Sequence, residues 1–313
     1  QLGKLRYLEC LQLRFVSRIP GGLEGLENVR RCAALRSLAI SVSPNPMGPQ
    51  PMPWSDARVV TQALSSLTSS DLPLLQVLRL DLQHCGLDAN DIGTVSAQGF
   101  CRRLTSVTMI LDGNQMIGET GGTVLGGAFP DLRHLRLRLN ECRIGPEGVQ
   151  RLLTPSFWDQ QRWIESLSVD FSDNPTLGDA GAEVLGQVLG HHCHRAPRLR
   201  SLFLGLRCCS IGNQGAYACR DLIRALARSG LTLVIDLSGN IIGDDGAIDF
   251  PELEHMLPGE VRILLDDNPL DQAVYFSAVS FWKRRAAAHR LITSWVAGYA
   301  SPVGINITKY KLR

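Results

Sequence analysis

The chain has 313 residues, a formal net charge of +2 and a sequence pI near 8.1, with 44% hydrophobic and 6% aromatic residues. This charge is too balanced to favour nucleic acid or an anionic membrane as the main partner. No stretch approaches the roughly 18 uncharged apolar residues of a membrane-spanning helix. The sequence therefore predicts neither direct nucleic-acid binding nor a membrane span.

In chain order, one apolar pattern recurs almost from end to end. Apolar residues occupy its first, fourth, sixth and eighth positions, Asn or Cys occupies the eleventh, and an aliphatic residue and Gly follow. Successive copies start about 27 to 40 residues apart, which is typical of a stacked solenoid. The nine copies are Leu8–Phe15, Leu35–Asn45, Leu75–Cys85, Leu104–Asn114, Leu132–Cys142, Ile164–Asn174, Leu199–Cys209, Leu233–Asn240 and Val261–Asn268.

Each position of the pattern has a physical reason. Alternating apolar residues turn one face of a short strand inward. The Asn side chain can bond to backbone groups that the following turn would leave unsatisfied, and Cys is a small apolar substitute there. The apolar spacing in Asp179–Leu189 predicts an amphipathic helix that begins at the Gly-Asp turn.

The run of Leu-x-x-Leu-x-Leu, Asn or Cys, and Ile-Gly-x-x-Gly resembles the leucine-rich repeats of the ribonuclease-inhibitor class, from residue 8 to about residue 275. The resemblance implies an α/β horseshoe of about nine repeats, with a parallel sheet on the concave side and helices on the convex side. It also implies protein binding. A third inward strand position, at Leu139, Phe171 and Leu206, departs from the family pattern and predicts strands longer than usual.

Two parts of the chain are expected from these patterns. Residues 1–275 form the solenoid, and residues 276–313 form a C-terminal helical cap with a basic tail, because a solenoid needs an end piece over its last exposed core. The nine cysteines are an odd count and lie mostly in strand-turn or helix positions, which favours an intracellular reducing compartment, cytoplasmic or inside an organelle. The chain starts at Gln1 rather than Met, so a targeting segment can be missing from it.

The concave surface follows from the pattern, because residues between inward ones point outward. We expect a partner to contact a mixed set of charged and apolar side chains there, although ordinary solvated sheet residues are an equal alternative. These candidate contacts are Arg79, Arg136, Arg138, Asp170, Phe203, Val234, Asp236, Arg262 and Leu264.

Two insertions supply further candidate contacts. Trp54 follows a Pro-rich stretch, residues 44–53, that predicts an extended loop, either a partner-binding arm or a passive surface loop. Phe157 and Trp158 lie in a lengthened crossover, where aromatic residues are typical of binding surfaces, although packing against the adjacent helix is the alternative.

The sequence shows no phosphate loop, zinc helix or nucleophile elbow, so we expect no enzyme, no cofactor, no metal site and no small-molecule substrate. The cluster His191, His192, Cys193 and His194 lacks the paired spacing of a zinc site. The function predicted is a non-catalytic protein-interaction scaffold, such as a structural or accessory subunit of a multi-subunit complex. The alternative is a regulator of an enzyme, such as an activator of a small GTPase, because similar repeats occur in activators of the Ran GTPase.

Overall fold

A computed structural model describes residues 7–15, 26–42, 61–62, 64, 71–96, 103–129, 131–226, 231–250, 253 and 260–271. The chain divides into two compact units, Gln1–Pro269 and Leu270–Arg313, and every helix and strand named below belongs to the first. The predicted division after residue 275 and the predicted cap over residues 276–313 lie outside the described residues.

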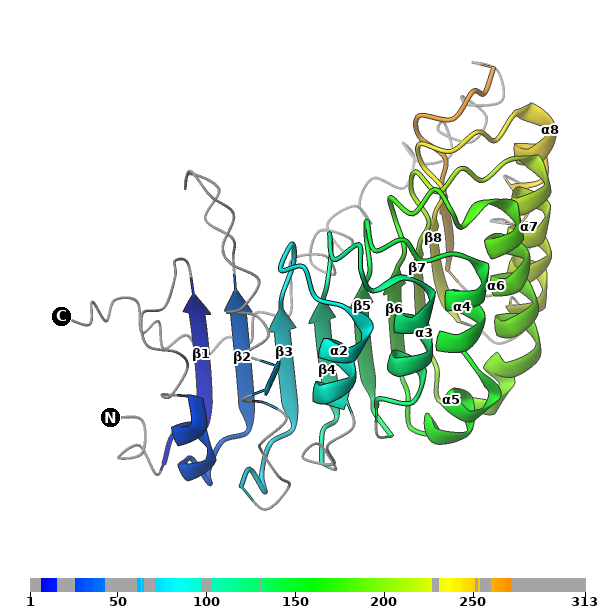
Figure 1. Cartoon of the computed structure of the whole chain (residues 1–313). Helices are drawn as coiled ribbons and strands as arrows, with labels where there is room; N and C mark the ends of the chain where they lie inside the picture. Colours follow the sequence, from blue (N-terminus) through cyan, green and yellow to red (C-terminus); the bar gives the residue numbers. More distant parts are fainter. Residues whose placement is uncertain are drawn as a thin grey trace. The chain divides into compact units, whose positions relative to one another are not determined.

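Among the described residues, nine strands form one parallel sheet in which each strand pairs with the next in the sequence (Figure 1). Equivalent positions of successive repeats face each other, as Leu135 faces Leu167. This register confirms the predicted stack of repeats. The strands are β1 Cys10–Phe15, β2 Ser37–Val42, β3 Val77–Asp81, β4 Ser106–Ile110, β5 His134–Arg138, β6 Ser166–Asp170, β7 Ser201–Gly205, β8 Thr232–Asp236 and β9 Val261–Leu264.

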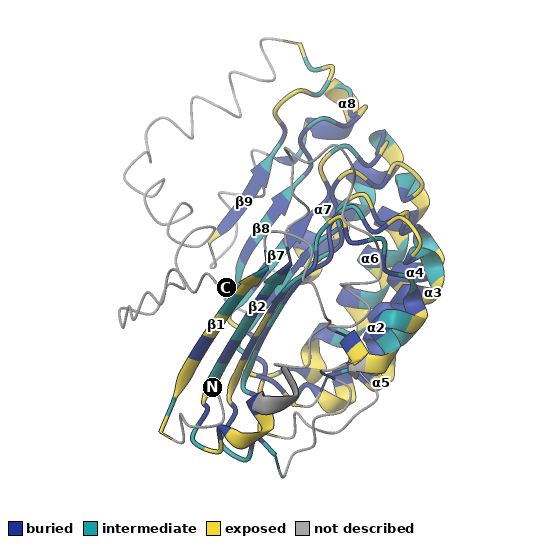
Figure 2. Cartoon of the chain, turned by 60° about the vertical axis from the view of Figure 1, so that its left-hand side comes forward, coloured by how far each residue is buried: buried dark blue, intermediate teal, exposed yellow. Residues whose placement is uncertain are grey.

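The α-helices of this unit cover one face of the sheet and leave the other face uncovered by them (Figures 1 and 2). The predicted helix over residues 179–189 is confirmed by α6, which begins at Gly178, where a backbone φ of 55° suits a residue without a side chain. The helical elements are η2 Leu26–Arg31, α2 Ala89–Ser96, α3 Gly118–Gly126, α4 Pro146–Leu152, α5 Pro155–Gln160, α6 Gly178–His192, η4 Cys193–Arg195, α7 Asn213–Leu226 and α8 Asp244–Ala247.

The sheet lies on the inside of the curve. Neighbouring strands are about 4.8 Å apart, whereas packed helices are about 8–10 Å apart, so a stack that advances by one strand and one helix per repeat curves towards its sheet. The uncovered face of the sheet is therefore the concave face, as the resemblance to leucine-rich repeats implied.

The prediction of longer strands is wrong. Leu139, Phe171 and Leu206 are fully buried, but each lies one residue past the end of its strand. Two residues further on, the backbone becomes left-handed, with φ of 54° at Glu141, 59° at Asp173 and 53° at Cys208. That conformation cannot continue a strand, so the third apolar residue anchors the turn instead.

The Asn side chains bond to backbone groups of the turns, as predicted, and some of these groups belong to the preceding repeat. The Oδ1 atom of buried Asn114 accepts hydrogen bonds from the N–H groups of Cys85 and Leu87, both at 3.0 Å. Its Nδ2 atom donates to the carbonyl oxygens of Leu82 and Leu111. Where Cys replaces Asn, as at Cys142, the thiol donates to the Leu111 carbonyl at 3.2 Å. In these described repeats the turn is thus completed by the repeat that follows it.

Candidate functional site

The concave face presents two parallel rows of side chains across the sheet, one residue from each strand. In the first row Arg79 faces Thr108, and Thr108 faces Arg136. In the second row Arg138 faces Asp170. The sheet therefore brings the predicted charged residues of β3 to β6 into one neighbourhood, although they are spread over 92 positions of the sequence from Arg79 to Asp170.

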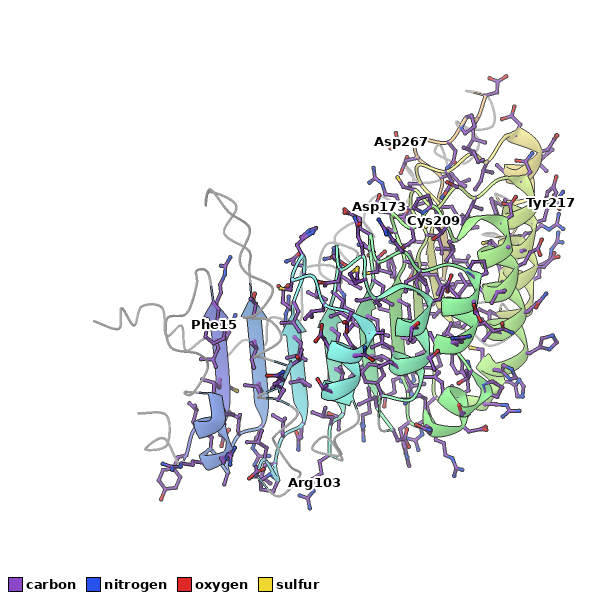
Figure 3. The ribbon with its side chains drawn as sticks, viewed as in Figure 1. Phe15, Arg103, Asp173, Cys209, Tyr217 and Asp267 are labelled. Atoms are coloured by element: carbon purple, nitrogen blue, oxygen red, sulfur yellow. The ribbon has the colours of Figure 1, made fainter. Side chains whose placement is uncertain are left out.

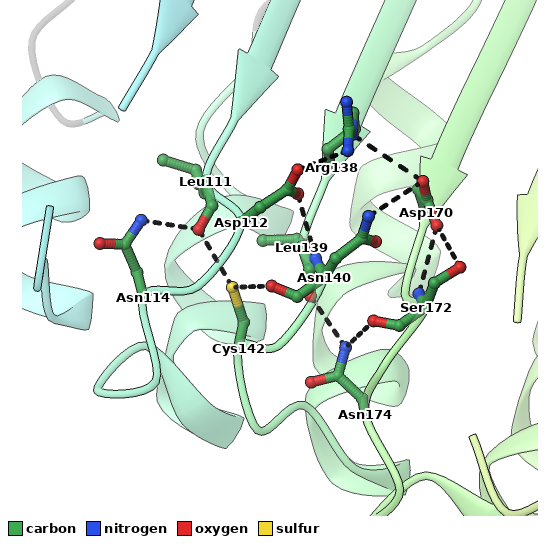
Figure 4. Close-up of polar contacts among 10 residues, drawn as sticks. All are labelled: Leu111, Asp112, Asn114, Arg138, Leu139, Asn140, Cys142, Asp170, Ser172 and Asn174. Carbon is green, nitrogen blue, oxygen red and sulfur yellow. Dashed lines mark hydrogen bonds and ion pairs between the residues drawn. The ribbon is translucent and has the colours of Figure 1, made fainter. Parts of the chain in front are cut away.

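A polar cluster occupies the carboxyl ends of β5 and β6 and the loop after β4 (Figure 4). Arg138 Nη2 lies 2.6 Å from Asp112 Oδ2, and its Nε lies 3.9 Å from Asp170 Oδ2. Asn140 Nδ2 donates to Asp170 Oδ2 at 3.3 Å, and the Ser172 hydroxyl donates to Asp170 Oδ1 at 2.7 Å. We name this set, Asp112, Arg138, Asn140, Asp170 and Ser172, the polar cluster.

The electrostatics of the polar cluster follow from its burial. Asp112 is only 6% exposed, and burial raises the pKa of its carboxyl group, while the Arg138 cation and the N–H of Asn140 act in the opposite direction. Arg138 lies between two carboxylates, so its charge is compensated within the chain. Of the two candidate contacts Arg136 and Arg138, Arg138 is therefore not a free cation.

Arg136 supplies the uncompensated charge at the centre of the face. Its pKa is lowered by burial first, and then by the Arg138 and Arg79 cations. Its side chain forms no ion pair or hydrogen bond with any described residue, and its buried Nε has no partner. Asp81 Oδ1 and Asn140 Oδ1 are also buried atoms without a hydrogen-bond partner. Buried donors and acceptors beneath this face are therefore left without a partner among the described residues.

An apolar surface adjoins this polar region on β7 and β8. Phe203 faces Val234, and both side chains are half-buried. In the neighbouring row, Asp236 faces the half-buried Leu264. Gly205 leaves room for the Asp170 carboxylate, since a Cβ atom at residue 205 would lie 2.1 Å from Asp170 Oδ1. Charged and apolar groups thus meet where β6 pairs with β7.

Three of the predicted contact residues are not available on the surface. Phe157 and Trp158 are 1% and 0% exposed, with their rings packed edge to face at a centroid distance of 5.2 Å. The crossover folds into the short helix α5, whose N-terminus is capped by Thr154, and this helix turns both rings into the core. Arg262 is 9% exposed and pairs with Glu260. Trp54 lies outside the described residues.

The sequence analysis missed three members of the polar cluster, Asp112, Asn140 and Ser172. Each directly follows the last inward apolar residue of its repeat, namely Leu111, Leu139 and Phe171. The outward position directly after the last inward apolar residue of each repeat is therefore the signal that identifies these residues. Their mutual hydrogen bonds depend on side-chain orientations that the pattern does not give.

The described residues show neither a metal-binding group nor a helix that could cross a membrane. No group of three or more His, Cys, Asp or Glu side chains there is arranged to hold a metal ion. In the same part of the chain, no helix combines the length and the apolar character that crossing a bilayer requires.

Comparisons with known proteins agree with the repeat pattern. A family model described as Leucine Rich repeat matches residues 131–153 and 233–250. The chain is 31% identical to the ribonuclease inhibitor of Sus scrofa over 178 residues, which make up 56% of this chain and 36% of that protein. It therefore spans 36% of the length of that curated relative.

Two solved structures show distant similarity. The yeast structure of the Rad7 and Elc1 complex aligns with 13% identity and a TM-score of 0.34, covering 87% of this chain and 80% of that chain. An internalin of Listeria monocytogenes aligns with 13% identity and a TM-score of 0.28, covering 88% of this chain and 86% of that chain.

The repeats, their single parallel sheet and these sequence matches show an α/β leucine-rich repeat solenoid, whose repeats are similar to those of ribonuclease inhibitor. Proteins of this class serve as protein-interaction scaffolds and are typically non-catalytic binding proteins.

Proposed function

We propose that this chain is a non-catalytic scaffold that docks a protein partner on its concave face across β5 to β8. The observation that carries the proposal is the position of the unpaired Arg136 relative to the apolar pair Phe203 and Val234. Ser168 alone separates Arg136 from Phe203 in the same row. With strands about 4.8 Å apart, the cation and the apolar pair lie about 10 Å apart, within reach of one bound segment.

The chemistry of this surface suits a protein better than a phosphate polymer. Affinity for nucleic acid comes from many basic groups that contact successive phosphates. Here Asp112 and Asp170 already compensate Arg138, and both carboxylates would repel a phosphate backbone. Arginine and aromatic side chains such as Arg136 and Phe203 are typical of the centres of protein interfaces.

A role as an accessory subunit of a larger assembly follows from the same surface. Arg136 Nε, Asp81 Oδ1 and Asn140 Oδ1 are costly to leave without partners. These atoms are buried, so the side chains must rotate to reach a partner, and a constitutive partner that bonds to them would remove that cost. The partner should therefore remain with the chain through purification.

The proposed compartment is a reducing one inside the cell. The thiols of Cys85, Cys142 and Cys209 donate hydrogen bonds to buried carbonyl oxygens in the turns. A thiol oxidised to a disulfide has no proton to donate, so these turns are complete only when the cysteines are reduced.

The test is affinity purification followed by calorimetry with the retained partner. Arg136→Glu and Phe203→Thr should each weaken binding by about tenfold or more, because both change the centre of the interface. Glu183→Arg, on the exposed outer surface of α6, is the control and should bind like the unmodified chain. If all three variants bind equally well while remaining folded, docking on the concave face is excluded.

A further inference from the structure

We propose that the edge of the sheet where β4 to β7 begin carries a second docking surface, which binds an acidic segment of a partner protein. This surface is separate from the concave docking site and does not depend on it. Figure 3 shows Arg103 at this edge, with Asp173 and Asp267 at the opposite edge, where the strands end. We define the edge patch as Arg103, Arg133, Arg162, Trp163, Arg198 and Arg200, all of which are exposed.

Backbone hydrogen bonds bring the members of the edge patch together. The N–H of Glu165 donates to the Arg133 carbonyl at 2.8 Å, and the N–H of Arg200 donates to the Glu165 carbonyl at 2.9 Å. Arg133 and Arg200 therefore lie on either side of Glu165, one strand away from it in each direction. Two residues before Arg133, Glu165 and Arg200, the equivalent positions hold Asp131, Trp163 and Arg198. The edge patch thus spans neighbouring repeats and does not belong to a single loop.

Trp163 and Arg198 form the centre of the edge patch. The Arg198 guanidinium carbon lies 3.7 Å from the centroid of the Trp163 ring. The backbone N–H of Trp163 donates to Asp131 Oδ1 at 2.9 Å, which fixes the backbone beneath the ring. The residue keeps 45% of its surface exposed. Stacking uses the flat face of a guanidinium and leaves the N–H groups at its rim free to bind a carboxylate through two hydrogen bonds.

The acidic residues around the edge patch already have partners. Glu165 pairs with Arg133 at 3.6 Å, and Asp159 pairs with Arg195 at 2.6 Å. Within the described part of the chain, Arg103, Arg162, Arg198 and Arg200 form no ion pair. Four guanidinium groups are therefore left for carboxylates from another molecule, beside an exposed aromatic ring.

The spacing of charges favours an acidic polypeptide over nucleic acid. Asp131 lies between the positions of Arg103 and Trp163, and Glu165 lies between Arg133 and Arg200. A continuous phosphate backbone would pass over both carboxylates and be repelled by them. In a polypeptide, carboxylates can be spaced to meet the arginines, with an apolar side chain left to contact Trp163.

The test measures fluorescence anisotropy of a short labelled poly-glutamate peptide mixed with the whole chain. The peptide should bind, with affinity that falls as salt is added. The double variant Arg198→Glu/Arg200→Glu should weaken binding by about tenfold or more, since attraction becomes repulsion at two positions. Trp163→Ala should also weaken binding, because it removes the surface on which Arg198 is stacked.

The control is Arg143→Glu/Arg207→Glu, which changes the net charge equally at the opposite edge of the sheet and should bind the peptide like the unmodified chain. Equal peptide affinity of the edge-patch variant and this control would overturn the proposal, since only net charge would then matter. Tighter binding of a labelled poly-uridine oligonucleotide than of the peptide, lost in the edge-patch variant, would also overturn it in favour of nucleic acid. The concave docking site is tested separately, by measuring how the Arg136→Glu variant binds the partner retained in purification.

Discussion

Asp179, in the first turn of α6, accepts a hydrogen bond of 2.9 Å at its Oδ1 atom from the backbone N–H of Gly215 in the first turn of α7. The same oxygen accepts from the N–H of Gly212 at 2.6 Å. Two further pairs repeat the arrangement, because Glu119 of α3 accepts from Gly148 of α4 and Asn213 of α7 accepts from Gly243 before α8. The N-termini of α4, α7 and α8 are thus capped by the preceding repeat rather than by their own sequences.

The cap at Asp179 should contribute measurably to stability. Asp179→Ala leaves two N–H groups at the start of α7 without their partner and should lower the free energy of unfolding by about 1–2 kcal/mol. Asp245→Ala is the control, because Asp245 also lies in a first helical turn but is exposed and caps no other repeat. Urea denaturation measures both variants. Equal losses of unfolding free energy in the two variants would mean that Asp179 stabilises the chain through the helix dipole alone and not through the cap.

Close packing between α3 and α4 depends on Gly122. A Cβ atom at residue 122 would lie 2.0 Å from the carbonyl oxygen of Gly148, so Gly122→Ala must separate the two helices. We expect a loss of about 1–3 kcal/mol. Gly127→Ala, at the end of the same helix, adds a Cβ atom that meets no other atom within 4 Å. The backbone of residue 127 also has an ordinary negative φ. The thermal midpoint of Gly127→Ala should stay close to that of the unmodified chain; a similar drop in both variants would contradict the packing argument.

The buried Asn side chains should be among the most sensitive polar positions. Asn240 accepts from the N–H groups of Cys209 and Ile211 and donates to the Leu206 carbonyl. Asn240→Ala leaves these buried groups unpaired and should cost about 2–4 kcal/mol. Asn90→Ala, at an exposed position of α2, should cost less than about 0.5 kcal/mol. Chemical denaturation compares the two, and a small effect at residue 240 would show that water replaces the amide.

Alkaline pH should destabilise the chain through its buried thiols. Burial raises the pKa of Cys142 and Cys209 from the ordinary value of 9.0 to about 12. Between these values the unfolded chain loses thiol protons that the folded chain keeps, so stability should fall as the pH rises from 9 to 12. Cys142→Ala should reduce the slope of stability against pH, whereas exposed Cys10→Ala should leave it unchanged. Urea midpoints across this range supply the measurement.

Removal of Arg138 should expose the cost of a buried carboxylate. Arg138→Gln leaves Asp112 without its cation, and we expect a loss of about 1–3 kcal/mol at pH 7, moderated by the partial exposure of Arg138. Burial already raises the pKa of Asp112, and loss of the cation raises it further. The deficit should therefore shrink when acid protonates Asp112. Arg36→Gln breaks a 3.9 Å pair between exposed side chains and should have little effect at any pH.

A comparison of urea midpoints at neutral and acidic pH tests the Arg138 prediction. A deficit that is the same at both pH values would mean that the guanidinium contributes by packing rather than by charge. The Arg36 variant serves as a reference for the effect of net charge in the same measurement.

The amino-acid sequence by itself determined the repeat architecture, because each leucine ladder alternates with a period set by the strand backbone. The same period correctly assigned Arg136, Phe203 and Val234 to the face away from the core. It also gave the role of the buried Asn residues, because a buried amide beside a turn needs hydrogen-bond partners and the turn backbone supplies them. These features are local, and a single strand and turn specify them.

Tertiary structure alone decided which side chains meet across repeats. Arg138 and Asp112 are 26 positions apart in the sequence, and only the stacking of β4 against β5 brings them to 2.6 Å. Trp158 lies in the core although its crossover had the composition of a contact surface, because helix α5 packs its ring inward. A side chain's own backbone sets its direction, whereas its partners depend on the position of the neighbouring repeat, which no single stretch of the sequence encodes.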